Sequence, residues 1–116
     1  MLLVEDSDMI SGALRMLLES GGFDVTLAST GDEAVQWKGD KGPDVMLLDV
    51  GLPDMDGLDV IEKLTSRGVR PSVIYAMTGH ADPATHHRCM AAGCDGVLLK
   101  PVPVQQLLRI VTEAVA

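Results

Sequence analysis

Hydrophobic residues alternate along the chain between two kinds of pattern. Short, nearly continuous apolar runs occupy residues 1–5, 24–28, 44–48, 72–77 and 96–99. Between these runs, apolar residues recur every three or four positions, which is typical of helices with one buried face. The alternation predicts five strand–helix units in series. Such a series favours an α/β fold, with a parallel sheet covered by helices on both faces.

Capping residues mark the ends of the predicted helices. Gly21-Gly22 ends the first one, and Thr30 with Glu33 three residues later has the form of a capping box that opens a short second helix. A proline at the first helical position and a glycine past the last one bound the fourth helix. The remaining predicted helices run from Gly57 to about Ser66, from Asp82-Pro83 to Gly93, and from Val104 to Val115.

The composition fits one domain with an aliphatic core. The 116 residues are enough for a single domain, taken as residues 1–116, without disulfide or metal staples. Hydrophobic residues make up 47% of the chain and aromatic residues only 3%, as expected for a sheet buried on both faces. The formal net charge of −8 disfavours binding to nucleic acid or to an anionic membrane, and favours a basic partner or a divalent cation.

The cysteines and the lack of long apolar runs suggest a cytoplasmic protein. Cys89 and Cys94 do not have the CxxC spacing, so we expect two reduced thiols. No apolar run approaches the ~18 residues of a membrane span, and the start has no signal-peptide pattern.

Polar side chains that could bind a ligand or react follow four of the predicted strands. Glu5 and Asp6 follow the first, Asp49 the third, Thr78 the fourth and Lys100 the fifth. Because parallel strands all point the same way, their carboxyl ends lie at one edge of the sheet, where open α/β folds place their ligands. We therefore expect these side chains to converge.

Such a cluster predicts a magnesium-dependent phosphoryl site. Close carboxylates repel by up to roughly 4 kcal/mol per pair at an effective dielectric near 20, so they hold either a proton or a cation. An open site of oxygen ligands favours Mg²⁺, and Asp49 could attack phosphorus as a nucleophile. Lys100 and the metal would neutralise the phosphoryl oxygens, and Thr78 would offer a hydroxyl.

Each of these residues also has an ordinary structural interpretation. Glu5 and Asp6 could cap the first helix, Asp49 could form an Asx turn, Thr78 could be a loop hydroxyl and Lys100 a solvated lysine. Their joint placement at four strand ends favours the functional interpretation. The Lys100-Pro101 bond is a candidate cis peptide, which would turn the lysine toward the edge.

Four segments resemble those of two-component response-regulator receiver domains: LLVEDS (2–7), DVMLLDVGLPDMDG (44–57), MTGHAD (77–82) and GVLLKPV (96–102). The resemblance implies a flavodoxin-like (βα)₅ fold, a doubly wound parallel five-stranded sheet of strand order 2-1-3-4-5. It also implies that a histidine kinase or a histidine phosphotransfer protein passes a phosphoryl group to Asp49. The protein would then be a signalling switch that catalyses only its own phosphotransfer and dephosphorylation.

The resemblance also implies roles for single residues. Asp6, Asp49 and the carbonyl of Gly51 would bind Mg²⁺ directly, and Glu5 would act largely through water. Thr78 would be the switch hydroxyl and Lys100 the phosphate-binding lysine. The output domain or downstream protein would contact the face formed by the predicted fourth helix, strand 96–99 and the last helix.

The chain departs from the family pattern in three respects, one of which is that its first strand begins at Met1 with fewer leading residues than usual. Val97 stands where the family usually has Phe or Tyr as a reporter of phosphorylation, so coupling through an aromatic ring is not expected. Gly51 and His80 occupy positions that modulate the lifetime of the acyl phosphate in the family.

Two other classes of function remain as alternatives. One is a receiver-like interaction module that works without phosphorylation, against which the intact set of acids, Thr78 and Lys100 argues. The other is an enzyme on the same fold. An aspartate-nucleophile phosphatase would need a DxD motif after the first strand, and an FMN protein would not place acids there.

Overall fold

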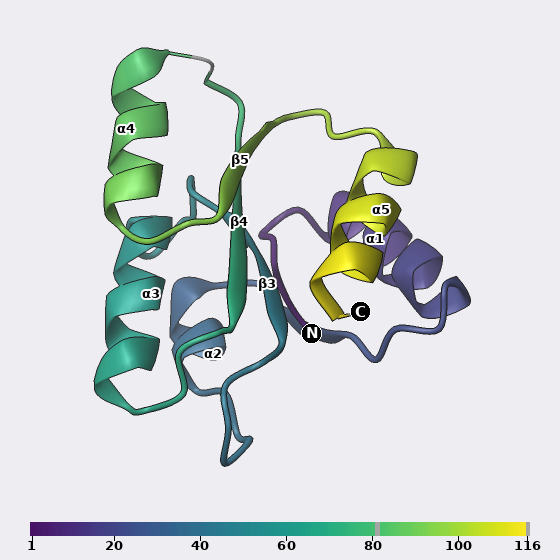
Figure 1. The fold of residues 1–116 in the computed structure, drawn as a ribbon, viewed down its shortest axis with the longest axis horizontal. Coiled ribbons are helices and arrows are strands. Elements are labelled where there is room, and N and C mark those ends of the chain that lie inside the picture. The colour runs from purple at the N-terminus through teal and green to yellow at the C-terminus, as the bar shows by residue number, and fades with distance from the viewer. Residues whose placement is uncertain (81, 116) are drawn as a thin grey trace.

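The structure, a computed structural model, describes residues 1–80 and 82–115. Ala81, inside the motif at 77–82, and Ala116, the last residue of the expected domain, lie outside the described residues. Five strands alternate with five helices in the described part of the chain (Figure 1). They are β1 (Leu2–Val4), α1 (Asp8–Ser20), β2 (Thr26–Ala28), α2 (Gly31–Val35), β3 (Val45–Asp49), α3 (Gly57–Ser66), β4 (Val73–Thr78), α4 (Pro83–Ala91), β5 (Gly96–Leu99) and α5 (Val104–Val115).

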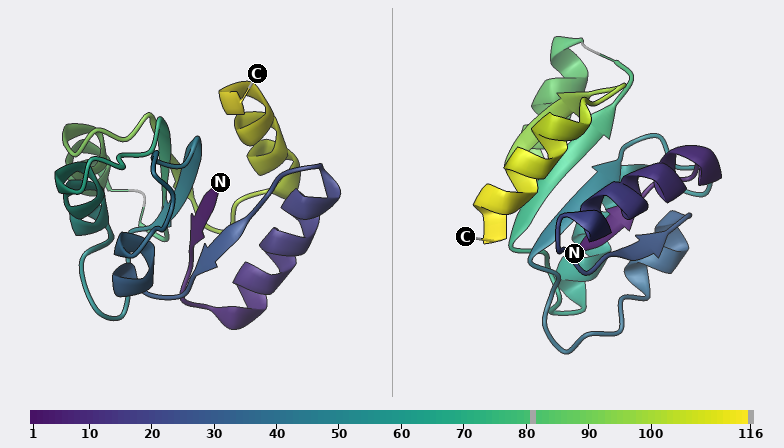
Figure 2. Two further views of the ribbon diagram at one scale, coloured as in Figure 1. Left: turned by 90° about the horizontal axis from the view of Figure 1, so that it is seen from below. Right: turned by 90° about the vertical axis from the view of Figure 1, so that its right-hand side faces the viewer.

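The strands form one parallel sheet in the order β2-β1-β3-β4-β5. Helices α1 and α5 cover one face, and α2, α3 and α4 cover the other (Figures 1 and 2). The predicted fold class and strand order are therefore confirmed. β3 lies at the centre, so the residue at its carboxyl end is surrounded by the ends of its neighbours.

Alternate residues of the central strands supply the two halves of the core. Leu2, Met46 and Leu48 belong to the cluster on the α2–α4 side, whereas Leu3 and Leu47 belong to the cluster on the α1/α5 side. Successive side chains of a strand point to opposite faces, and both faces are covered here. This explains why the strands read as unbroken apolar runs in the sequence.

Two strands extend one residue further than the apolar pattern predicts. β3 and β4 end at Asp49 and Thr78, because Asp49 pairs with Met77 and Thr78 pairs with Leu99 in the parallel ladder. The two polar residues are therefore fixed by strand hydrogen bonds rather than carried on loops. At the other extreme, β2 is limited to Thr26–Ala28, shorter than the run at 24–28.

Helix α2 has the predicted N-cap and is short, as predicted. The Oγ1 atom of Thr30 accepts the N–H of Glu33 at 3.1 Å, but the Glu33 carboxylate accepts the N–H of Ser29 rather than that of Thr30. The helix stops at Val35, where the Arg67 guanidinium donates to the carbonyls of Val35 and Trp37. These bonds satisfy carbonyl groups that a longer helix would have paired internally. None of the described helices is long and apolar enough to cross a membrane.

Candidate functional site

Three carboxylates meet at the carboxyl edge of the sheet, as the sequence predicts. One carboxylate oxygen each of Glu5, Asp6 and Asp49 lies within 4.8 Å of the other two. Glu5 and Asp49 are buried, whereas Asp6 is exposed and opens the cluster to solvent. This is the only such group of possible metal ligands within residues 1–80 and 82–115, and none of the three histidines belongs to it.

Lys100 reaches this cluster from the end of β5. Its Nζ lies 2.9 Å from Oδ2 of Asp49 and 3.0 Å from Oε2 of Glu5. The bond between Lys100 and Pro101 is cis, the isomer that the sequence left open. The lysine therefore bridges two of the three acids and neutralises part of their charge.

Glu5 is the most deeply buried member of the cluster. Only 1% of the residue is exposed, and its Oε1 accepts the backbone N–H of Ser7 at 3.2 Å. Its Oε2 accepts no hydrogen bond of normal geometry, although Nζ of Lys100 is close enough to form an ion pair. Burial raises the pKa of Glu5, against the opposing effect of Lys100. A buried carboxylate oxygen with free lone pairs is suited to a cation or to a bound water.

The pKa of Lys100 is set by the same two influences, burial and the Lys100–carboxylate bonds, but here the bonds outweigh burial. Burial alone would lower it, but the bonds to Asp49 and Glu5 outweigh burial and raise the pKa above its ordinary value. The lysine is therefore fully charged at neutral pH. A permanent cation at this position attracts an incoming phosphoryl group.

Thr78 lies on the neighbouring strand end, and its residue is 5% exposed. Its Oγ1 accepts the backbone N–H of His80 at 3.1 Å, and its carbonyl accepts the N–H of Lys100 at 2.8 Å. The threonine thus links the β4–α4 loop to the residue that carries the ammonium. The sequence placed Thr78 at this edge, but only the structure gives these bonds.

The segment after Asp49 folds back over the strand end. The N–H of Gly51 donates to Oδ1 of Asp49 at 3.0 Å, so Asp49 forms an Asx turn in addition to its ion pair with Lys100. Further on, Asp56 caps α3 by accepting the N–H of Leu58 at 3.0 Å, and it forms an ion pair with Arg88 of α4. The phosphoacceptor candidate is therefore connected through this loop to two helices.

Val97 and Tyr75 lie on opposite sides of the sheet. Val97 packs against the core cluster on the α2–α4 side, whereas Tyr75 packs against the cluster on the α1/α5 side. The chain's single tyrosine therefore does not replace the aromatic residue that the family places at residue 97.

The sequence patterns did not predict three interactions near the site. Asp54 accepts the N–H groups of Gly31 and Asp32 at the start of α2, both at 2.9 Å, and these bonds lower its pKa. The ion pair of Arg88 and the close packing of Gly57 were also not predicted. The motif at 52–57 contains Asp54, Asp56 and Gly57, but nothing in its spacing identifies their partners.

Comparisons with known proteins agree with this geometry. The family model described as the response regulator receiver domain matches residues 1–112. The transcriptional regulatory protein KdpE from Mycobacterium tuberculosis is 34% identical over 114 residues, covering 98% of this chain and 50% of the relative. A cyclic di-GMP phosphodiesterase from Thermotoga maritima is 35% identical over 114 residues, covering 97% of this chain and 30% of the relative. The chain thus spans half or less of these relatives.

Solved structures show the same architecture. The receiver domain of sensor histidine kinase PA1611 from Pseudomonas aeruginosa, described with a magnesium ion in its active-site cleft, has a TM-score of 0.84 and 30% identity, with coverage of 98% of this chain and 94% of that one. The chemotaxis protein CheY4 from Vibrio cholerae has a TM-score of 0.86 and 26% identity, with coverage of 97% and 95%. With its five-stranded parallel fold and its acidic edge, the chain belongs to the response regulator receiver domain family.

Proposed function

We propose that Asp49 accepts a phosphoryl group from a phosphohistidine and thereby switches the surface of this receiver domain. The observation that carries the proposal is the bridge from Lys100 to both Asp49 and Glu5 at the carboxyl edge of the sheet. It holds one carboxylate in a partly open acidic site beside a permanent cation. We take residues 1–116 as one such domain, which the family match over residues 1–112 supports.

In the proposed transfer, a carboxylate oxygen of Asp49 attacks phosphorus in line with the phosphorus–nitrogen bond of the donor. That bond breaks, its electron pair stays on the imidazole nitrogen, and an acyl phosphate remains on Asp49. Lys100 then neutralises phosphoryl oxygens, and the hydroxyl of Thr78 donates a hydrogen bond to one of them. The added charge biases a two-state surface, so the domain acts as a switch rather than as an enzyme with an external product.

The residues of the site fit Mg²⁺. Asp6, Asp49 and the carbonyl of Gly51 would hold the ion, with Glu5 acting largely through water. The buried Oε2 of Glu5, beside which the Lys100 ammonium at 3.0 Å is the one charged partner among the described residues, supports this assignment, as does the all-oxygen donor set. When bound, the ion would supply charge neutralisation at the transferring phosphoryl group.

The donor is a histidine kinase or a histidine phosphotransfer protein, and we propose that it docks over α1. Met9 is 86% exposed and Met16 70%, and Ile10 and Leu17 are also exposed on this helix. An apolar pocket of about 300 Å³, lined in part by Ile10, borders Glu5 and Lys100. An apolar surface next to the reacting groups suits a partner that must bring its histidine to Asp49.

The output contact is proposed on the face formed by α4, β5 and α5. Met90 on α4 and Leu99 at the end of β5 are 43% and 52% exposed. The ion pair of Arg88 with Asp56 connects α4 to the loop after Asp49, so a change at that loop has a direct route to this face. We expect no nucleic acid contact by this domain itself, because its net charge is −8.

Incubation with acetyl phosphate and Mg²⁺, followed by intact-mass measurement, tests the proposal. We expect the mass of one added phosphoryl group, lost in Asp49→Asn with the circular dichroism spectrum unchanged. A wild-type protein that gains no mass would instead be a phosphorylation-independent interaction module.

A further inference from the structure

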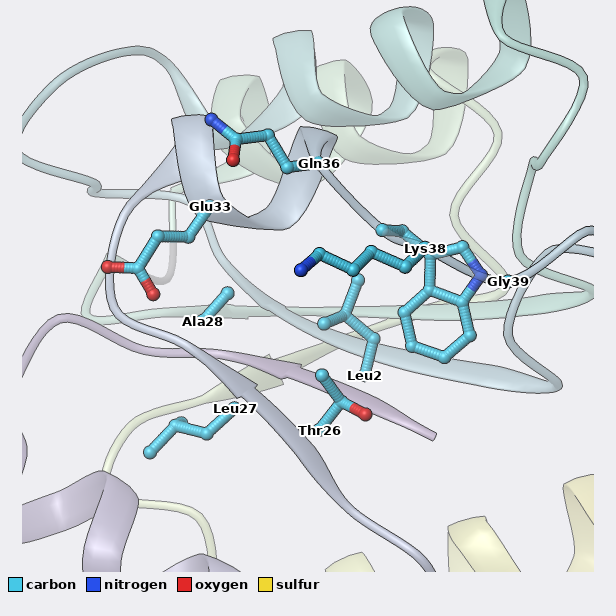
Figure 3. A pocket seen from close by; sticks show the side chains of 9 residues that line it. Leu2, Thr26, Leu27, Ala28, Glu33, Gln36, Lys38 and Gly39 are labelled. Atoms are coloured by element: carbon cyan, nitrogen blue, oxygen red, sulfur yellow. The ribbon is translucent and has the colours of Figure 1, made fainter.

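A groove lies beside the edge strand β2, and none of the three clustered acids lines it. It is bounded by β2, by α2 and by the segment Trp37–Gly39, and its volume is about 550 Å³ (Figure 3). It lies next to the end of α2 at Val35, and Leu2 and Ala28 in its lining are almost fully buried. We call this site the β2–α2 groove.

The aromatic wall of the groove is fixed in place. The indole Nε1 of Trp37 donates to the carbonyl of Lys41 at 2.8 Å, and Arg67 holds the Trp37 carbonyl at 2.9 Å. A Cβ on Gly39 would lie 2.7 Å from that indole nitrogen, so only glycine lets the loop pass this closely. The ring is therefore ordered before any ligand arrives, which lowers the entropic cost of binding.

The strand beside the groove presents unpaired main-chain groups. Thr26 donates its N–H to Met1, and Ala28 accepts the N–H of Glu5, so both residues turn their backbone groups toward β1. Leu27 between them turns its N–H and C=O outward, where β2 has no neighbouring strand in the described sheet. The three residues of β2 include no charge and no proline, which are the usual means of protecting an edge strand.

The charge of the groove differs from that of the whole molecule. The Lys38 side chain extends into the groove (Figure 3), and its ammonium forms no ion pair with any residue in 1–80 or 82–115. The Glu33 carboxylate at the other end already accepts the N–H of Ser29 at 3.3 Å. Glu33 keeps its negative charge at one end of the groove, whereas Lys38 is a cation without an ion-pair partner among the described residues, which an acidic side chain would complement.

We propose that the β2–α2 groove binds an extended, acidic peptide segment of a partner protein, which adds to β2 as a sixth strand. Its backbone pairs with the N–H and C=O of Leu27, an apolar side chain fills the space beside Trp37, and a carboxylate pairs with Lys38. A small molecule could fill the apolar space, but only a polypeptide also satisfies the exposed strand edge.

Trp37 is the single tryptophan of the chain, so its fluorescence reports occupancy of the groove directly. The probe is an acetylated and amidated peptide, Thr-Glu-Val-Phe-Val-Glu-Thr, titrated into the whole chain. We expect a saturable change in Trp37 emission. Lys38→Glu should weaken binding about fivefold or more, whereas Lys63→Glu, an exposed lysine on α3 outside the groove, should leave it unchanged.

Two further arms separate strand addition from simple filling of the pocket. One peptide is N-methylated at Phe and another at both Val residues; the one whose methyl groups face β2 should lose binding. The third ligand is free phenylpropionate, a small aromatic anion. The proposal is overturned if wild type shows no saturable change, if Lys38→Glu binds like wild type, if both methylated peptides still bind, or if phenylpropionate binds as tightly as the peptide.

Discussion

Gly57 packs directly against the backbone of Asp49: a Cβ at residue 57 would lie 2.4 Å from the Asp49 carbonyl oxygen. The N–H of Gly57 also donates to the carbonyl of Val50 at 2.9 Å. The first residue of α3 is therefore seated on the strand end that carries the phosphoacceptor. This contact makes the position of α3 and the position of Asp49 depend on each other.

Gly57→Ala should therefore disturb the fold and the site together. The new methyl group meets backbone atoms, which cannot rotate away, so we expect a loss of about 1–3 kcal/mol in the free energy of unfolding. We also expect slower phosphorylation by acetyl phosphate. Gly12→Ala on α1 is the matched control, because a Cβ there meets nothing within 4 Å. It should stabilise the helix by about 0.5–1 kcal/mol. Equal effects of the two variants in urea unfolding would contradict the close contact.

Glu5→Gln should change the pH dependence of the metal-free protein. The folded-state pKa of Glu5 is raised above 4.5, so its contribution to stability is present below that pH and is lost as the pH rises through the raised value. At neutral pH the buried charge is thus destabilising. The amide removes this dependence, so melting temperatures of the two proteins should diverge in favour of the variant as the pH rises from 4 toward 7. The variant should also need more Mg²⁺ for phosphorylation. An unchanged Mg²⁺ requirement would argue against a cation at Glu5, and an unchanged melting difference would argue against the raised pKa of Glu5.

Asp54→Asn tests the link from the phosphoacceptor loop to α2. The carboxylate of Asp54 accepts two N–H groups at the start of α2, which lowers its pKa below 3.8. Its contribution to stability is present above that value and is lost as the pH falls through the lowered pKa. We expect the variant to melt below wild type at pH 7 and level with it in strong acid. Asp59→Asn, on an exposed residue of α3, is the control and should show a smaller difference.

Ile10→Lys on α1 should slow phosphorylation by a phosphohistidine protein but not phosphorylation by acetyl phosphate. If a phosphohistidine protein docks on α1, a charge there slows transfer from that protein and leaves phosphorylation by acetyl phosphate unchanged. Met90→Lys on α4 serves as the control and should transfer normally. The measurement is the rate of phosphoryl transfer from a phosphorylated kinase domain that is active on wild type. Slower reaction of Ile10→Lys with acetyl phosphate would instead indicate damage to the site.

Cys89 and Cys94 should resist alkylation in the folded protein. Both thiols are buried, and burial raises the pKa of Cys94 to about 12 and also raises that of Cys89. We expect iodoacetamide to modify neither residue at pH 8 until urea unfolds the chain, as followed by intact mass. Rapid modification without denaturant would show that the end of α4 opens readily.

Some features of this protein are determined by the sequence alone. The alternation of apolar runs and helical patterns fixes the five strand–helix units, because burial on two sheet faces requires it. Parallel topology then places Glu5, Asp6, Asp49, Thr78 and Lys100 at one edge, whatever the details of packing. Local signals were equally informative, since the N-caps at Thr30 and Asp82 depend on neighbours within three residues.

Other features depend on contacts between distant segments, which local patterns do not encode. The apolar pattern did not show that Asp49 and Thr78 complete their strands, because that depends on their partners in β4 and β5. Arg67, just after α3, donates to carbonyls at the end of α2, and Lys38 forms no ion pair with the described residues beside an open groove. Long polar side chains can bond to several partners whose interaction free energies differ little. Only the folded chain decides which of those partners lies within reach.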